Sequence, residues 1–106
     1  MSSPGSDEAQ SLRHVIIRGR VQGVGFRAWT EMKAHELGLA GWVRNRRDGT
    51  VEAMFAGDAA AVAAMVEACR RGPPGGQVVD AADRPGTAQE LKLRRPGETF
   101  SVLPTA

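Results

Sequence analysis

Cysteine and aromatic residues are scarce in this sequence. Its 106 residues include one cysteine and no tyrosine, and aromatic residues make up 5% of the chain. A single cysteine, Cys69, cannot close an internal disulfide, which favours a reducing compartment, and we expect a cytoplasmic protein. No stretch approaches the roughly 18 consecutive apolar residues that span a bilayer, so no membrane association is expected. Residues 1–11 also lack the basic-then-apolar pattern of a secretory signal.

Metal-binding side chains are also few. The two histidines, His14 and His35, lie on different predicted elements, which makes a poor metal site, and we expect both on the surface. The basic part of the chain has no pair of carboxylates with catalytic spacing. We therefore expect neither a metal ion nor a cofactor.

The length of the chain limits the possible folds. A chain of 106 residues fits one domain and excludes a full dinucleotide-binding fold, a (β/α)8 barrel and a protein kinase. Hydrophobic residues at 42% and charged residues at 25% are typical of a globular protein. We expect residues 1–11 to form a disordered tail and residues 12–106 to form the domain.

Hydrophobic periodicity predicts two helices and five strands. Helical spacing of apolar residues predicts helices over 26–37 and 59–71, and Cys69 lies on the buried stripe of the second. The Asp48-Gly49 pair is a strong hairpin signal. Strands are expected at residues 13–21, 41–47, 50–56, 77–82 and 99–103.

This order of elements predicts an α+β, ferredoxin-like βαββαβ fold, with an antiparallel sheet and two helices on one face. Trp42 is expected in the core. Residues 84–98 are expected to be irregular, with a short extended piece at 91–93.

Positive charge is concentrated in one third of the chain. Residues 13–47 contain eight basic and two acidic side chains, a local charge of +6, whereas the remaining residues carry a charge of −4. Such a positive field suits a small anion or a nucleic-acid backbone, although a solvated basic surface would have the same composition.

Glycine is concentrated between the first predicted strand and the first helix. Residues 19–25 include three glycines, and Arg27 follows at the start of the helix. Glycines let several backbone N–H groups converge on one anion, the start of a helix favours negative charge, and an arginine can bind two phosphate oxygens. The alternative is a tight turn with a surface arginine.

Three other phosphate-related motifs are excluded. Residues 23–28 match GxGxxA, but a hairpin follows this helix where a dinucleotide fold needs a parallel strand. The pattern GxxxxGK[ST] is absent, and the glycine-rich segment has no cysteine nucleophile. Further along, Asn45 has an amide that could hold a water molecule, although on its own it is more typical of a turn residue near the hairpin.

Three segments together resemble the acylphosphatase family. They are GRVQGVGFR at residues 19–27, LGLAGWVRN at 37–45 and DGTVE at 48–52, and the likeness extends from about residue 15 to residue 57. The resemblance implies a ferredoxin-like fold and hydrolysis of carboxyl–phosphate anhydrides of small molecules. It also implies that Asn45 positions the attacking water and that Arg27 binds the phosphoryl group. The phosphate loop it implies consists of Gln22, Gly23, Val24, Gly25, Phe26 and Arg27.

Two other classes of function remain open from the residues. One is a βαββαβ RNA-binding module, but it would need stacking aromatic residues on its central strands, and the predicted hairpin strand offers only Phe55. The other is a small-anion-binding domain without turnover, which would not need both Arg27 and Asn45. We therefore expect a monomeric enzyme that acts on a small acyl phosphate and does not bind nucleic acid.

Overall fold

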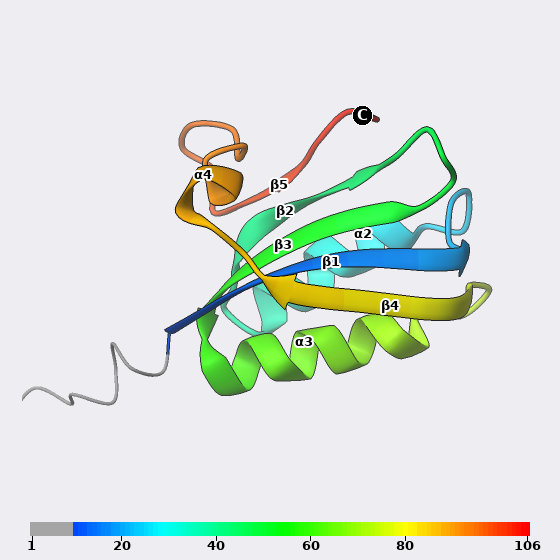
Figure 1. The fold of residues 1–106 in the computed structure, drawn as a ribbon, viewed down its shortest axis with the longest axis horizontal. Helices are drawn as coiled ribbons and strands as arrows, with labels where there is room; N and C mark the ends of the chain where they lie inside the picture. Colours follow the sequence, from blue (N-terminus) through cyan, green and yellow to red (C-terminus); the bar gives the residue numbers. More distant parts are fainter. Residues whose placement is uncertain (1–9) are drawn as a thin grey trace, which may run out of the picture.

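The computed structural model describes residues 10–106 (Figure 1). Along the chain it contains β1 (Gln10–Arg20), α2 (Phe26–Glu36), β2 (Ala40–Asn45), β3 (Val51–Asp58), α3 (Ala59–Arg71), β4 (Gln77–Pro85), α4 (Ala88–Leu91) and β5 (Phe100–Val102). The expected tail at residues 1–9 lies outside the described residues. Residues 10 and 11, which we expected in that tail, already belong to β1 and pair with the end of β3.

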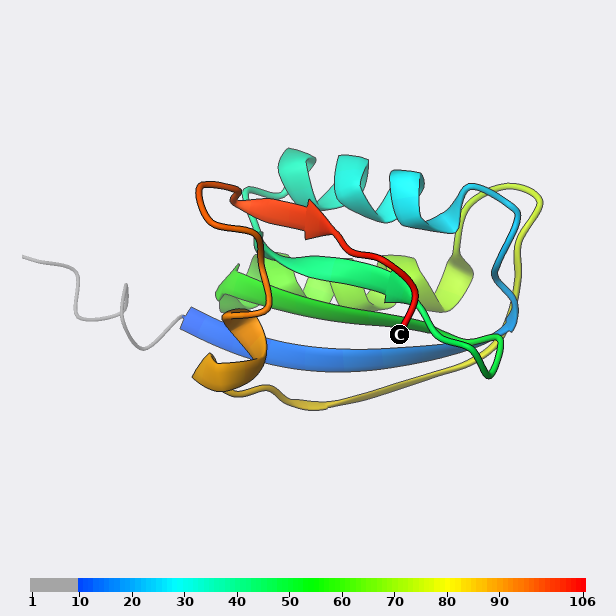
Figure 2. The ribbon, with the colours of Figure 1, turned by 90° about the horizontal axis from the view of Figure 1, so that it is seen from above.

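The ferredoxin-like fold is confirmed. The strands form one sheet in the order β4-β1-β3-β2-β5, and Figure 2 shows α2 and α3 together on one face of it. β1 pairs antiparallel with both β3 and β4, and β2 pairs antiparallel with β3. The closing strand, β5, pairs in parallel with β2, so the complete sheet is mixed.

The main core lies between the sheet and the two long helices. Helix α3 has the predicted limits, and its stripe of Val62, Met65, Val66 and Cys69 is buried as expected. The Asp58 carboxylate caps its first turn by accepting from the N–H of Ala61.

A second, smaller core covers the opposite face of the sheet. Trp42 is fully buried there with Met54 and Leu103, and Leu91 of α4 packs against them. The Trp42 indole Nε1 donates to the Glu90 carbonyl oxygen at 2.7 Å. Trp42 is therefore in the core, as predicted, but on the face away from α2 and α3.

The connection between β2 and β3 is longer than predicted, because both strands are shorter at the turn. Its strands end at Asn45 and resume at Val51. The carbonyl oxygen of Arg46 accepts from the N–H of Gly49, and Gly49 has a φ of +93°. This pattern is a type I turn followed by a left-handed residue, the usual geometry of a three-residue hairpin loop.

Three other expectations were wrong. Residues 91–93 are not extended: Leu91 ends α4, a single turn that begins with a capping box formed by Thr87 and Glu90. His14 is buried, at 5% exposure, because α4 and the end of the chain cover its face of the sheet, whereas His35 is exposed as predicted. β4 also continues to Pro85, beyond the predicted limit at residue 82.

No helix within residues 10–106 has the length and apolar character needed to cross a bilayer.

Candidate active site

A cavity of about 380 Å³ lies where the segment before α2 meets the end of β2. Both segments are at the same end of the molecule, beside the tip of the β2–β3 hairpin (Figures 1 and 2). The cavity is lined by Val21, Gly23, Gly25, Phe26, Arg27, Ala28, Glu31, Asn45 and Val102.

The glycine-rich segment forms the wall of the cavity at the start of α2. Gly23 and Gly25 have φ angles of +76° and +77°, in the left-handed region that favours glycine. A Cβ atom at either position would meet nothing within 4 Å, so backbone conformation, not crowding, requires glycine there. Gly25 is the N-cap of α2, and no side chain in the described part of the chain caps this helix. Its first N–H groups therefore have no intrahelical or side-chain partner.

Arg27 brings an uncompensated positive charge to this wall. The side chain is half-buried, and within residues 10–106 it forms neither an ion pair nor a hydrogen bond. Six other arginines do form ion pairs: Arg13, Arg44, Arg46, Arg70, Arg84 and Arg95. The first turn of α2 also contains no acidic residue. The Arg27 guanidinium and the positive end of the helix dipole can therefore act on the same anion.

Asn45, the last residue of β2, contributes an amide to the cavity. Side chains alternate along the strand, so Val43 and Asn45 belong to the helix side, whereas Trp42 and Arg44 belong to the other. The Asn45 carbonyl oxygen accepts from the N–H of Ala106 at 3.0 Å, which holds the strand end in place. Among the described residues, no protein group bonds to the Asn45 side chain, so its donor and acceptor are both available.

Gln22 has a different position from the rest of the predicted phosphate loop. Its side-chain Nε2 donates to the carbonyl oxygens of Arg46 at 2.7 Å and Thr50 at 2.8 Å. These bonds tie the glycine-rich segment to the tip of the β2–β3 hairpin. The Gln22 side chain thus joins the two segments that carry Arg27 and Asn45.

Val24 and Phe26, two other residues of the predicted loop, differ in where their side chains lie. Val24 does not line the cavity and packs against the main core. Phe26 lines the cavity and is also buried, with its ring edge-to-face on Trp29 at 5.4 Å between centroids. These two apolar side chains anchor the loop on either side of Gly25.

Four lining residues were not predicted. Ala28 directly follows Arg27, and Glu31 lies one helical turn beyond it, so helical spacing alone could have indicated both. Val21 ends the first predicted strand. No local sequence pattern places Val102 at the cavity, because its position depends on the parallel pairing of β5 with β2.

Neither a metal centre nor a reactive thiol is found near the cavity in residues 10–106. No group of three or more His, Cys, Asp or Glu side chains there could hold a metal ion. Cys69 is fully buried on α3, and burial raises the pKa of its thiol to about 12. It is an inert core residue at neutral pH.

Fold and site together define a small ferredoxin-like domain with a cavity at the N-terminus of α2. A sequence model of the acylphosphatase family matches residues 13–95. An acylphosphatase of Nitrobacter hamburgensis is 61% identical over 94 residues, which are 89% of this chain and 95% of that protein. An acylphosphatase of Bradyrhizobium diazoefficiens is 58% identical over 97 residues, which are 92% of this chain and 98% of that protein.

Solved structures agree with this assignment. An acylphosphatase from Coxiella burnetii has a TM-score of 0.80 and 29% identity, covering 95% of this chain and 100% of that one. An acylphosphatase from Bacillus subtilis has a TM-score of 0.75 and 38% identity, covering 87% of this chain and 97% of that one. The chain belongs to the acylphosphatase family of hydrolases.

Proposed function

We propose that the protein hydrolyses small acyl phosphates by direct attack of water on phosphorus, in the cavity between α2 and β2. One observation carries this proposal: a guanidinium, a helix N-terminus and an amide line the same cavity, and none of the three has a side-chain partner within residues 10–106. The first two can hold a phosphoryl group, and the third can hold the nucleophile.

The phosphoryl group is bound at the glycine-rich wall. Backbone N–H groups of residues 22–27 and the Arg27 guanidinium donate to its oxygens, where charge builds up in the transition state. The left-handed glycines hold this backbone in its curled form before the substrate arrives, so little reorganisation is needed during the reaction.

Asn45 places the attacking water. The water donates to or accepts from the Asn45 amide, which aligns it with the bond that breaks. A new oxygen–phosphorus bond forms, the phosphorus–acyl oxygen bond breaks, and its electron pair leaves on the carboxylate. The water proton passes to a phosphoryl oxygen, so the products are a carboxylate and inorganic phosphate.

This chemistry requires no strong general acid. A carboxylate leaves without protonation, whereas the alkoxide of an ordinary phosphate monoester does not. The charges that a metal ion would supply come from Arg27 and the helix dipole. We propose that this hydrolysis needs no metal ion and that a monomer carries it out in the cytoplasm.

Burial of the strand aromatics argues against an RNA-binding role. Trp42, Phe55 and Phe100 are all buried, so none of them can stack on a base. A non-catalytic anion sensor would bind phosphate through Arg27 and would have no use for an unpaired Asn45 amide beside it.

The test compares two substrates of different leaving group. The purified protein should hydrolyse benzoyl phosphate and should act on glycerol 2-phosphate, an alkyl monoester, at only a small fraction of that rate. Equal rates on both substrates would contradict the assigned chemistry. Phosphate binding without hydrolysis would favour the sensor, and tight binding of single-stranded RNA would favour the RNA-binding module.

A further inference from the structure

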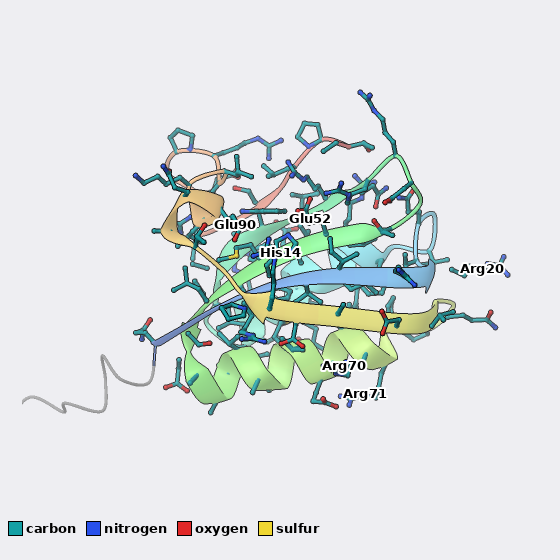
Figure 3. All side chains as sticks on the ribbon, in the orientation of Figure 1. His14, Arg20, Glu52, Arg70, Arg71 and Glu90 are labelled. Atoms are coloured by element: carbon teal, nitrogen blue, oxygen red, sulfur yellow. The ribbon has the colours of Figure 1, made fainter. Side chains whose placement is uncertain are left out.

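A cluster of ionisable side chains surrounds a buried carboxylate on the sheet face opposite α2 and α3. We call it the Glu52 cluster; it consists of His14, Arg44, Arg46 and Glu52. The Glu52 carboxylate accepts from Arg44 Nε at 2.7 Å and from Arg46 Nη1 at 3.2 Å, and its second oxygen lies 2.7 Å from His14 Nε2. Figure 3 shows His14 and Glu52 beside each other over the central strands.

Stability alone is a weak explanation for this cluster. Glu52 is 6% exposed, and burial by itself raises the pKa of its carboxyl. The hydrogen bonds from His14 and Arg44 and the Arg44 charge outweigh burial, and the pKa of Glu52 is held below its usual value. Buried ion clusters of this kind can often be replaced by apolar residues without loss of stability. Their best-attested benefit is a single, fixed geometry.

The geometry fixed here is that of the strand around Asn45. Arg44 and Arg46 are its two neighbours in the chain, and both side chains are held by the same carboxylate. Glu52 lies directly opposite Arg44 in the β2–β3 register. The backbone of Asn45 is therefore clamped from the far face, while its amide remains free in the cavity.

The clamp also reaches the phosphate loop. The carbonyl oxygen of Arg46 accepts from Gln22, whose side chain belongs to the glycine-rich segment. The Glu52 carboxylate thus restrains both Arg44 and Arg46, the neighbours of Asn45. Arg46 in turn holds the loop that carries Arg27.

We propose that Glu52 is a positioning residue, which acts through Arg44 and Arg46 to hold the Asn45 amide in line for water attack. This inference rests on the role of Asn45 given under the proposed function. His14 completes the arrangement by occupying the second carboxylate oxygen, so that Glu52 cannot rotate away from the arginines.

The first test replaces Glu52 with its neutral isostere. Glu52→Gln keeps the shape of the side chain but weakens both arginine contacts. The kcat for benzoyl phosphate should fall by about tenfold to 10²-fold, the range that a displacement of about 1 Å can cause. Inhibition by inorganic phosphate should change much less than kcat, because Arg27 and the loop N–H groups are intact and Gln22 still binds the Thr50 carbonyl oxygen. Arg44→Gln should give the same pattern and serves if Glu52→Gln does not fold.

A matched control separates positioning from general stability. The carboxylate of Asp83 also bridges two arginines, Arg13 and Arg70, but on β4 at the far edge of the sheet. Asp83→Asn should lower the melting temperature and leave kcat and phosphate inhibition unchanged. An equal loss of kcat in this control would overturn the proposal.

The decisive measurement is a double-mutant cycle. In the Asn45→Ala background, Glu52→Gln should lower kcat no further, because the group that it positions is gone. If Asn45→Ala is strongly impaired and Glu52→Gln still causes its full loss in that background, this proposal is wrong and the proposed function stands. If Asn45→Ala is fully active, the assigned role of Asn45 fails, and the positioning role of Glu52 fails with it.

Discussion

Arg27 and Asn45 line one cavity but should fail in different ways when they are replaced. Arg27 is assigned to the phosphoryl oxygens in the ground and transition states, so Arg27→Ala should lose phosphate binding as well as turnover. Asn45 is assigned to the water, so Asn45→Ala should keep much of its phosphate affinity while kcat falls about 10²–10³-fold. The measurement is kcat and the phosphate inhibition constant for each variant.

Two further observations complete this comparison. Arg27→Lys should rescue poorly, since an ammonium cannot reproduce a two-pronged contact. Circular dichroism should show both alanine variants folded, because neither side chain packs in the core. The roles would have to be exchanged if Asn45→Ala lost phosphate binding while Arg27→Ala retained it.

Glu31 gives the cavity one negative charge, a turn of helix beyond Arg27. Glu31→Gln should strengthen inhibition by inorganic phosphate, because a repulsive charge beside the anion is removed. The gain should shrink as salt is raised, since screening already weakens that repulsion. If the water proton passes to the substrate, kcat should stay within about tenfold of the wild type. A loss of about 10³-fold or more, the upper range for general-base catalysis, would instead identify Glu31 as the base.

At the scale of elements, the proposed phosphate loop depends on two glycines with open space around them. Gly23→Val or Gly25→Val should cost about 1–2 kcal/mol of left-handed strain, and the strained backbone should relax away from the curled form. Phosphate inhibition should therefore weaken severely in both variants.

Gly38 supplies the control for this prediction. It also has a left-handed φ, of +70°, and open space, but it lies at the other end of α2. Gly38→Val should lose comparable stability in thermal unfolding and bind phosphate normally. Normal phosphate binding by both loop variants would rule out a preformed nest of N–H groups.

Helix α4 should respond to acid through Glu90. The pKa of Glu90 is held at about 2, against 4.5 for the free side chain. Its carboxylate accepts hydrogen bonds from Arg84 and from the Thr87 N–H, and these outweigh the small opposing effect of burial. A depressed carboxyl pKa stabilises the folded state above pH 4.5, and this contribution is lost as the pH falls from 4.5 toward 2. Because the Glu90 carbonyl oxygen binds the Trp42 indole, α4 should loosen and expose Trp42 in this range.

Tryptophan fluorescence would record that change. A Trp29→Phe background leaves Trp42 as the reporter, and its emission should shift to longer wavelength between pH 4.5 and 2. In the same background Glu90→Gln should already show the shifted emission at neutral pH. Identical acid titrations of the two proteins would show that Glu90 does not hold α4 in place.

Over the whole molecule, local signals predicted the elements well and distant contacts poorly. The Asp48-Gly49 turn and the helical stripes depend on residues close together in the chain, and each lies where it was predicted. The parallel pairing of β5 and the cover that α4 forms over Trp42 join residues far apart in the chain, and no short pattern encodes them. The prediction that His14 lies on the surface was wrong because it could not include this cover over its face of the sheet.

The same distinction holds for the site. Arg27 and Asn45 were found from motifs, and the structure brings both to one cavity. The tether from Gln22 to the hairpin could not be read from the sequence, because a glutamine in a glycine-rich loop suggests an anion contact as readily as a carbonyl contact. The contacts of Glu52 with Arg44 and Arg46 likewise depend on strand register. A slip of one residue would move Glu52 to the other face of the sheet and break them.

The charge of the whole site leads to the last prediction, that hydrolysis needs no divalent cation. Phosphoryl transfer without a metal requires fixed positive charge, and Arg27 and the uncapped start of α2 supply it in a chain segment with a local charge of +6. The kcat for benzoyl phosphate should therefore be the same before and after dialysis against EDTA. Added Mg²⁺ should not raise it, and Arg27→Ala should not be rescued by Mg²⁺. Activity that disappears with EDTA and returns with a divalent ion would show that a metal supplies the charge assigned here to Arg27.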